Sequence, residues 1–347
     1  MSGSQAGRAY IGSFTAAGGR GIVTADLDPA DGSLTVLDAT DVLPDPSYLT
    51  ACGGLLYAVS ETTDGAVAAF RTDTVPVRLA APPTLVDGDG PTHLSVWPEA
   101  ARVLTANYGS GSVTVVPLRT DGTPDPAGRD VLAHTGSGPH PQRQQTPHAH
   151  QVLPDPSGRW ALSVDLGTDS VRVCALDDDG RVTLHHETAL RPGSGPRHLA
   201  FHPAGDHAYV LNELTPTLTV CRWDAADGTL KPLTELQVLP EAPAGDAYPS
   251  EVVVAPDGRF LWVATRGENT VSLFSLDPTG EQPVLRAIVP CGGDWPRDLA
   301  LDPSGRFLYA ANERSGDVTW FAVDAESGVP VRAGSVRVPA ASCVVFS

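Results

Sequence analysis

One segment of the chain combines side chains that can transfer protons with side chains that can bind anions. Residues 136–150 read Gly-Ser-Gly-Pro-His-Pro-Gln-Arg-Gln-Gln-Thr-Pro-His-Ala-His, which places Arg143, His148 and His150 close together in the sequence. Imidazole readily gives and takes a proton near neutral pH, and guanidinium forms paired hydrogen bonds with carboxylate or phosphate. The segment is therefore a candidate site for acid–base chemistry on an anionic molecule.

The His148-Ala-His150 spacing is also compatible with a metal site. Histidine-based metal sites need further His, Cys or carboxylate ligands, and no acidic residue completes a set near this segment. We therefore expect neither a metal nor another cofactor. In the repeat described next, His150 falls at a place that is aliphatic in other copies. Its alternative role is to brace the segment through a buried hydrogen bond.

A repeat of about 45–55 residues sets the elements that position these side chains. Each copy contains a proline, an apolar strand, a turn resembling D-P-x-G-R, a second apolar strand, a glycine-containing turn and a third strand. The copies begin at Pro46, Pro91, Pro147, Pro196, Pro249 and Pro296. A strand-rich unit repeated at this period is typical of the blades of a β-propeller.

The two ends of the chain complete the blade count. Residues 339–346 match the first strand of a copy with nothing after it, and residues 10–15 match a second strand with no first strand before it. We therefore predict an all-β fold, a seven-bladed β-propeller of four-stranded antiparallel blades, closed by the C-terminal strand completing the first blade. Closure hides exposed sheet edges. We expect a single domain over residues 1–347, with residues 1–8 as a flexible tail.

Composition and charge exclude several classes of binding partner for this protein. The formal net charge of −18 disfavours nucleic acid and an anionic membrane surface. The five cysteines lack C-x-x-C spacing, no apolar run reaches the length of a membrane span, and the first residues lack a signal-peptide pattern. We therefore expect a cytoplasmic protein that acts on a small molecule, as a monomer or a weak homo-oligomer.

The repeat predicts which distant residues meet, because corresponding positions of the blades lie on rings around one axis. The loop before the first strand and the loop after the second strand of a blade emerge on the same face. The polar residues expected around this opening are His148, Arg197, Glu213, Arg266 and Arg297, with Asn107 and Asn312 as further ligand contacts. Asparagine is also common in turns between strands. Several arginines at one opening of an acidic protein indicate an anionic ligand.

Several longer motifs resemble those of a known family. They read Arg143-Gln-Gln-Thr-Pro-His-Ala-His, Asp165-Leu-Gly-Thr-Asp, and Gly193-Ser-Gly-Pro-Arg-His-Leu-Ala-Phe-His-Pro-Ala-Gly followed by Leu211-Asn-Glu. These motifs closely resemble the seven-bladed propeller lactonases, which include propeller-type 6-phosphogluconolactonase and 3-carboxy-cis,cis-muconate cyclase. The resemblance extends from about Tyr10 to the C-terminus.

The resemblance implies catalytic residues. In the muconate cyclase branch one histidine, two arginines and a glutamate are the proposed working residues. They correspond here to His148, or alternatively His150, and to Arg197, Arg266 and Glu213.

The resemblance also implies a reaction, although members of one fold differ in substrate. The first function is hydrolysis of a small anionic sugar lactone such as 6-phosphogluconolactone, with the histidine as general base and Glu213 either orienting it or serving as its proton partner. Arg143, His150 and Arg297 are expected to contact the substrate. One alternative is a cyclase or isomerase that closes a lactone on an unsaturated acid. Another is a non-catalytic propeller that binds other proteins.

Overall fold

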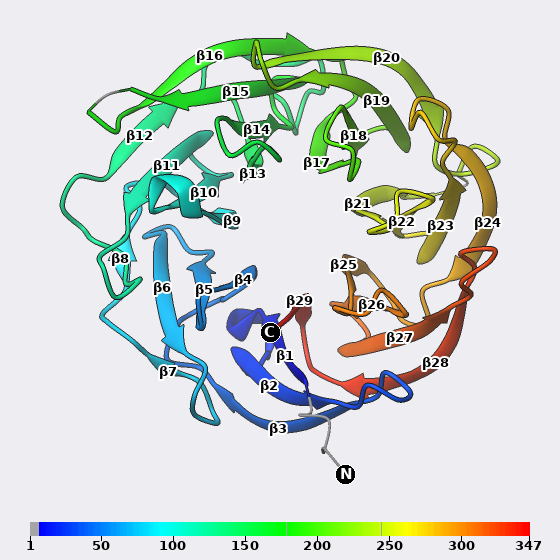
Figure 1. Cartoon of the computed structure of the whole chain (residues 1–347), viewed down its shortest axis with the longest axis horizontal. Helices are drawn as coiled ribbons and strands as arrows, with labels where there is room; N and C mark the ends of the chain where they lie inside the picture. Colours follow the sequence, from blue (N-terminus) through cyan, green and yellow to red (C-terminus); the bar gives the residue numbers. More distant parts are fainter. Residues whose placement is uncertain (1–6, 178, 244) are drawn as a thin grey trace.

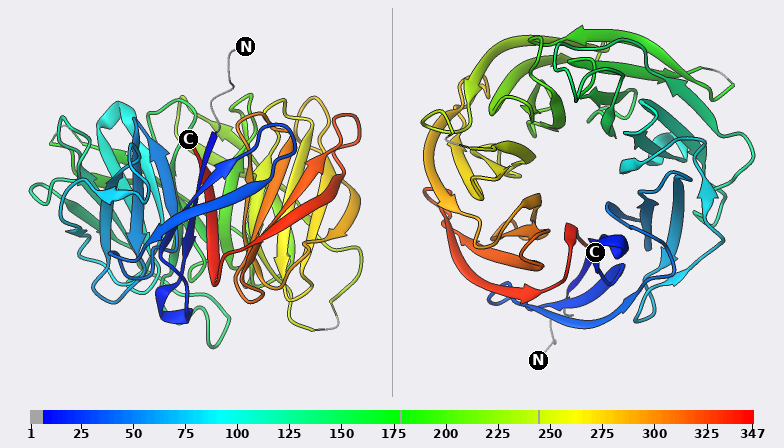
Figure 2. Two further views of the ribbon diagram at one scale, coloured as in Figure 1. Left: turned by 90° about the horizontal axis from the view of Figure 1, so that it is seen from below. Right: turned by 180° about the vertical axis from the view of Figure 1, so that it is seen from behind.

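Seven antiparallel sheets form a ring around a central channel (Figure 1). The computed structural model describes residues 7–177, 179–243 and 245–347. Figure 2 shows the ring from below and from behind, with the sheets standing side by side like the blades of a propeller. The predicted seven-bladed β-propeller is confirmed, and the blades are numbered 1 to 7 in chain order from the sheet that contains the N-terminal strand.

Within each blade the strands follow one another outwards from the channel. The innermost strands are β29 (Ala341–Phe346), β4 (Leu49–Cys52), β9 (Pro91–Trp97), β13 (Ala149–Pro154), β17 (Pro196–Phe201), β21 (Tyr248–Val254) and β25 (Pro296–Leu301). The second strands are β1 (Gly7–Ser13), β5 (Leu55–Ser60), β10 (Arg102–Asn107), β14 (Ala161–Asp165), β18 (His207–Asn212), β22 (Phe260–Arg266) and β26 (Phe307–Asn312).

The outer half of each blade is more variable. The third strands are β2 (Ile22–Leu27), β6 (Ala66–Arg71), β11 (Ser112–Pro117), β15 (Ser170–Leu176), β19 (Thr217–Asp224), β23 (Thr270–Ser275) and β27 (Asp317–Val323). The outermost strands are β3 (Leu34–Thr40), β7 (Arg78–Leu79) with β8 (Thr84–Leu85), β12 (Asp130–Ala133), β16 (Val182–Ala189), β20 (Thr229–Gln237), β24 (Val284–Pro290) and β28 (Pro330–Arg337). In blade 2 the outermost strand is thus divided into two short pieces. Within the described residues, two 3-10 helices, η1 (Thr15–Ala17) and η2 (Pro98–Ala100), lie in loops.

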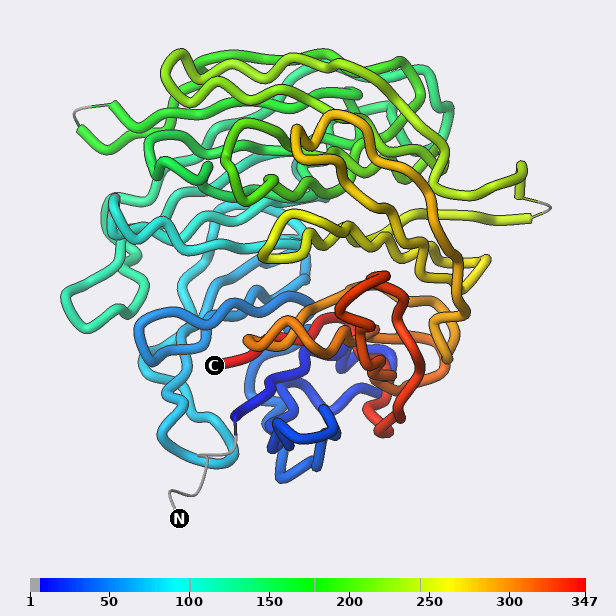
Figure 3. Tube along the Cα trace, turned by 45° about the vertical axis from the view of Figure 1, so that its right-hand side comes forward, coloured from blue at the N-terminus to red at the C-terminus, as the bar shows by residue number. Residues whose placement is uncertain are grey.

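The two ends of the chain close the ring. Strand β29 pairs antiparallel with β1, so blade 1 takes its innermost strand from the C-terminus, as predicted (Figure 3). Gly7 and Arg8 belong to β1, and Arg8 forms an ion pair with Asp26 on β2. These two residues are therefore part of the sheet and not of the predicted tail, because pairing with β2 fixes them. Residues 1–6 of that tail lie outside the described residues.

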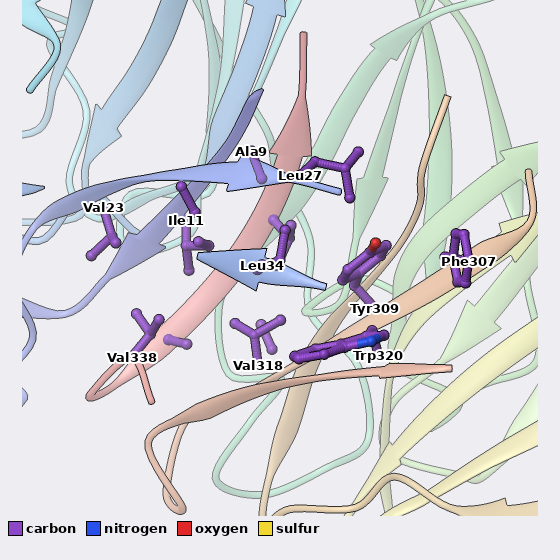
Figure 4. Packing of buried hydrophobic residues seen from close by; sticks show 14 residues of the cluster. Ala9, Ile11, Val23, Leu27, Leu34, Phe307, Tyr309, Val318, Trp320 and Val338 are labelled. Carbon is purple, nitrogen blue, oxygen red and sulfur yellow. The ribbon is translucent and has the colours of Figure 1, made fainter. Parts of the chain in front are cut away.

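Apolar side chains fill the interfaces between neighbouring blades. Each of seven hydrophobic clusters in the described part of the chain joins two adjacent blades. The cluster between blades 7 and 1 includes Ile11, Tyr309 and Trp320 (Figure 4). The same interface requires Gly32, because a Cβ there would lie 2.5 Å from the ring of Phe307. Since every blade packs on both neighbours, the channel-facing residues stand on a rigid scaffold.

None of the helices in the described ranges has the length and apolar character needed to cross a bilayer. The cysteines are all free thiols in the structure.

An irregularity near the start of the innermost strands positions the site. In blades 1 and 3 to 7, the pairing of the innermost with the second strand skips one residue. Such bulges re-aim side chains and are frequent next to active sites. In blade 5 the skipped residue is Arg197, and both Arg197 and His198 line the channel. The bulge therefore lets a blade direct two consecutive side chains into the channel.

Candidate functional site

Equivalent positions of the blades form three tiers along the channel. The upper ring lies at the ends of the second strands and comprises Phe14, Glu61, Tyr108, Leu166, Glu213, Arg266 and Glu313. The middle ring lies at the bulge position and comprises Ser342, Ser47, Thr92, His150, Arg197, Ser250 and Arg297. The lower ring lies one residue further on and comprises Cys343, Tyr48, His93, Gln151, His198, Glu251 and Asp298.

Blade 4 follows a different frame from the one predicted. Ala149, and not Pro147, pairs with Asp165 at the place where a proline begins the other copies. His150 is therefore the bulge residue, and Val152 fills the aliphatic core position that the sequence assigned to His150. That assignment was wrong because the insertion carries a proline two residues before the structural start of the strand. The correction moves His150 from the core to the channel.

Glu213 lies at the centre of a cationic cluster. Its Oε1 is 2.7 Å from Arg143 Nη2, and its Oε2 is 2.8 Å from Arg266 Nη2 and 3.2 Å from Arg197 Nε. Burial acts to raise the pKa of Glu213, but Arg266, Arg197 and Arg143 lower it to about 2. The carboxylate is therefore ionised at neutral pH, and positive charge remains in excess around it.

Arg297 extends this cluster along the opening. Its Nη1 lies 3.1 Å from Glu313 Oε2, and its guanidinium carbon lies 5.0 Å from the centre of the Phe14 ring. Burial and the charge of Arg266 lower the pKa of Arg197 to about 9, so Arg197 stays cationic at neutral pH. The structure thus brings the arginines and the glutamate of the predicted opening into one charged group.

His148 is oriented by the backbone and by a stacked tyrosine. Its Nδ1 lies 2.9 Å from the carbonyl oxygen of Tyr108, and because a carbonyl only accepts, Nδ1 donates. The rings of His148 and Tyr108 stack with centres 4.4 Å apart and planes 18° apart. The backbone N–H of His148 donates to Asp165 Oδ1 at 2.9 Å. In the tautomer that this hydrogen bond selects, the lone pair lies on Nε2, as a general base requires.

A buried network behind His148 was missed by sequence reasoning. Asp165 Oδ2 lies 2.6 Å from His134 Nδ1 and 2.8 Å from Arg172 Nη1. Burial acts to raise the pKa of Asp165, but hydrogen bonds from His134 and the His148 backbone, together with Arg172, lower it below its usual value. The sequence contained one signal of this network: Asp165 carries a carboxylate where the equivalent residue of blade 5, Asn212, carries an amide. The network fixes the backbone that carries His148.

The inserted segment 136–148 folds so that Arg143 reaches the cluster. Gln144 is fully buried, and its Oε1 accepts the N–H of His140 at 3.0 Å. The Nδ1 of His140 in turn accepts the N–H of Arg143 at 3.2 Å. Arg143 Nη2 donates to the Tyr108 hydroxyl at 3.2 Å as well as to the carboxylate. The insertion thereby holds Arg143 between the tyrosine and the carboxylate that it contacts.

Asn107 and Asn312 do not face the opening. Both are fully buried. The Nδ2 of Asn107 donates to Ser112 Oγ at 3.1 Å and to Thr114 Oγ1 at 2.9 Å, and the Nδ2 of Asn312 donates to Thr319 Oγ1 at 3.1 Å. These bonds join the second and third strands inside their blades. We therefore reassign both residues from ligand contacts to structural roles.

Neutral imidazoles lie in the two deeper tiers. Burial, aided by nearby arginine and histidine charges, lowers the pKa of His93, His150 and His198 well below its usual value. The ring centres of His150 and His93 lie 5.1 Å and 5.4 Å from that of His198. His150 therefore offers a neutral hydrogen-bonding group to the channel. Across the described ranges, no group of three or more His, Cys, Asp or Glu side chains is arranged to hold a metal ion.

Two buried carboxyl groups, those of Glu251 and Asp298, belong to the lower ring. Glu251 Oε2 lies 2.7 Å from His198 Nδ1, and Asp298 Oδ2 accepts the N–H of Val344 at 2.8 Å. With Arg197 they border a small pocket inside the channel. Burial raises the pKa of Glu251 to about 7, and burial together with Glu251 raises the pKa of Asp298 well above its usual value. The pair therefore retains a proton at neutral pH.

Replacing Asp298 by asparagine is expected to stabilise the protein at pH 8. Because the folded pKa of Glu251 is raised from 4.5 to about 7, the folded state binds more protons in that window and loses stability as pH rises through it. Asparagine removes one charge but keeps an oxygen for the Val344 N–H. Denaturant unfolding should show a gain of about 1–3 kcal/mol at pH 8 and little change at pH 4. Equal stability of the two proteins at pH 8 would contradict the shared proton.

The chain is similar to a known protein family over nearly its whole length. A family model described as "Lactonase, 7-bladed beta-propeller" matches residues 8–346. The 6-phosphogluconolactonase of Bacillus subtilis is 33% identical over 272 residues, which is 77% of each chain. A periplasmic gluconolactonase of Pseudomonas aeruginosa superposes with a TM-score of 0.89 at 30% identity, covering 99% of both chains. A Lactobacillus plantarum protein superposes with a TM-score of 0.92 at 28% identity, covering 99% of this chain and 100% of the other.

Proposed function

Because this chain belongs to the seven-bladed β-propeller lactonase family, we propose that it hydrolyses the ring ester of a small anionic sugar lactone of the 6-phosphogluconolactone type. The observation that carries the proposal is the cationic cluster around Glu213. A protein with a net charge of −18 repels anions over most of its surface. A cationic opening in such a protein marks the place where an anion is expected to bind.

In the proposed reaction His148 acts as the general base. Its Nε2 takes a proton from water while the water oxygen bonds to the lactone carbonyl carbon, and the carbonyl electron pair moves onto the carbonyl oxygen. Arg197 and Arg266 offset the charge that develops on that oxygen. When the intermediate collapses, the bond between the carbonyl carbon and the ring oxygen breaks. The protonated His148 then returns its proton to the departing ring oxygen, which leaves one open-chain hydroxy acid.

Glu213 does not exchange protons in this scheme. Its pKa of about 2 keeps it ionised at neutral pH, so it has no proton to donate. His148 alone takes and returns the proton in the proposed reaction. We therefore give Glu213 a positioning role, in which its carboxylate holds Arg197 and Arg266 at the reacting ester. This role replaces the acid–base partnership with histidine that the sequence predicted. Arg143, at the more exposed edge of the cluster, is the arginine placed to contact a phosphate or carboxylate of the substrate.

Comparing a phosphorylated with an unphosphorylated lactone tests the substrate class. Fresh 6-phosphoglucono-δ-lactone and glucono-δ-lactone would be followed by NMR, and we expect kcat/KM to be at least about tenfold higher for the phosphorylated compound. Arg143→Gln should reduce this preference and leave turnover of glucono-δ-lactone nearly unchanged. Equal values for both lactones would contradict an anion-binding role. Turnover of a carboxylated muconate, with neither lactone consumed, would instead support a cyclase.

A further inference from the structure

The residue two positions before the middle ring adopts a left-handed backbone conformation in most blades. These residues are Asp45, Gly90, Gly195, Trp295 and Ala340, with φ values of 44°, 58°, 61°, 67° and 52°. The slot is a requirement of the fold, and only glycine meets it without steric cost, because every other residue carries a Cβ. A bulky aromatic residue in this region of φ is uncommon and disfavoured. Trp295 is therefore the residue in this slot that backbone geometry does not explain.

A second departure from the repeat accompanies Trp295. In blade 5 the equivalent pair is Gly195 and Leu214, and a Cβ on Gly195 would lie 2.3 Å from Leu214 Cγ. In blade 7 the leucine is replaced by Arg314, whose guanidinium carbon lies 3.3 Å from the centre of the Trp295 ring. The guanidinium lies over the face of the indole, at a place where a leucine would obstruct the ring. The two replacements fit each other.

The loop holds the indole beside the charged cluster. The backbone N–H of Trp295 donates to Asn269 Oδ1 at 2.8 Å, and the backbone carbonyl of Trp295 accepts the N–H of Glu313 at 3.1 Å. The guanidinium carbon of Arg266 lies 5.6 Å from the centre of the Trp295 ring and 5.9 Å from that of Tyr248. The two aromatic rings lie 6.1 Å apart at 64°. Both are half-buried, so part of each ring is left to contact a ligand.

We propose that Trp295, together with Tyr248, forms an apolar wall that selects substrates with a compact carbon ring. The inference rests on the proposed lactonase function and deepens it. Arginines and carboxylates recognise the charge of a substrate, but charge alone does not separate a cyclic ester from any other small anion. The carbon atoms of the lactone ring pack on the aromatic wall while Arg266 contacts the ester. Trp295 is thereby a specificity-determining residue, held in its strained slot by Arg314.

Trp295→Gly is the most informative variant, because glycine occupies the same slot in blades 3 and 5. The variant should fold with an unchanged or higher Tm, since glycine adopts the left-handed conformation without the strain that tryptophan has there. We expect its KM to rise about tenfold for both the phosphorylated and the unphosphorylated lactone, with kcat changed less than about threefold. Its affinity for the product 6-phosphogluconate, measured by calorimetry, should fall by at most a few-fold because the product is an open chain. Ala340→Gly changes the same slot in blade 1 and should leave KM unaltered.

The outcomes separate this inference from the proposed function. If the wild type hydrolyses the lactone and Trp295→Gly keeps its KM within about twofold for both lactones, the aromatic wall is disproved and the lactonase function stands. A fall in kcat with no change in KM would also overturn it, because the indole would then act on the chemistry and not on ring binding. If the wild type itself does not hydrolyse either lactone, the proposed function fails and this inference fails with it.

Discussion

Replacing His148 by alanine is expected to lower kcat/KM for the lactone by about two to four orders of magnitude. The hydrogen bond from Nδ1 to the Tyr108 carbonyl fixes the tautomer, and the stacked tyrosine fixes the ring plane. Alanine removes the Nε2 lone pair that the proposed reaction needs. Steady-state rates of acid release at pH 7 would measure the loss. Because His148 precedes β13 and is only half-buried, the variant should unfold at nearly the wild-type temperature.

Two further variants make this result interpretable. His185→Ala removes an exposed histidine of the outermost strand β16 and should leave the activity unchanged. His150→Asn should raise KM more than it lowers kcat, because a neutral buried imidazole is suited to hydrogen bonding and poorly suited to holding a proton. A larger loss of kcat in the His150 variant than in the His148 variant would transfer the role of base to His150.

Glu213→Gln is expected to have the second large effect, on both stability and activity. The variant leaves Arg143, Arg197 and Arg266 without their shared carboxylate, and breaking a buried ion pair by removing one partner destabilises by about 3–5 kcal/mol. The arginines also lose the group that orients them, so kcat/KM should fall by about two to three orders of magnitude. Denaturant unfolding and initial rates would be measured on the same preparation.

The pH dependence of unfolding gives an independent readout of the same carboxylate. The folded pKa of Glu213 is about 2, below its usual 4.5, so its contribution is fully present above pH 4.5 and is lost as pH falls towards 2. The Gln variant should lack this part of the acid sensitivity. Glu313→Gln, at the equivalent position of blade 7, removes one partly exposed pair with Arg297 and should cost less than about 1 kcal/mol. Equal effects of the two substitutions would contradict the central place of Glu213.

The fold was predictable from the sequence because the same pattern of strands and turns recurs in every copy of the repeat. Turn and strand signals that are weak in one copy become decisive when six copies agree, and the split copy at residues 339–346 and 10–15 fixed the ring closure. The frame of blade 4 was not predictable in the same way. Its insertion contains a proline that imitates the start of a copy, and only the pairing of Ala149 with Asp165 reveals the true register.

The main charged residues around the opening were predictable from the sequence, but the residues deeper in the channel were not. Ring geometry placed Arg197, Glu213 and Arg266 at one opening, where they form a single charged group. It gave no indication of the bulge, and therefore none of the lower ring with Glu251 and Asp298. Contacts across long sequence separations depend on side-chain direction, which a repeat does not encode. The expected cytoplasmic location and the oligomeric state stay predictions.

We infer that this propeller hydrolyses a small anionic lactone at the opening around Glu213. The most direct test is a pH-stat measurement of proton release when the purified wild-type protein is added to freshly generated 6-phosphoglucono-δ-lactone. We predict release well above the spontaneous rate, saturating with substrate and inhibited competitively by inorganic phosphate, which the arginines would also bind. Proton release at the spontaneous rate, over a range of protein concentrations, would contradict the proposed lactonase activity.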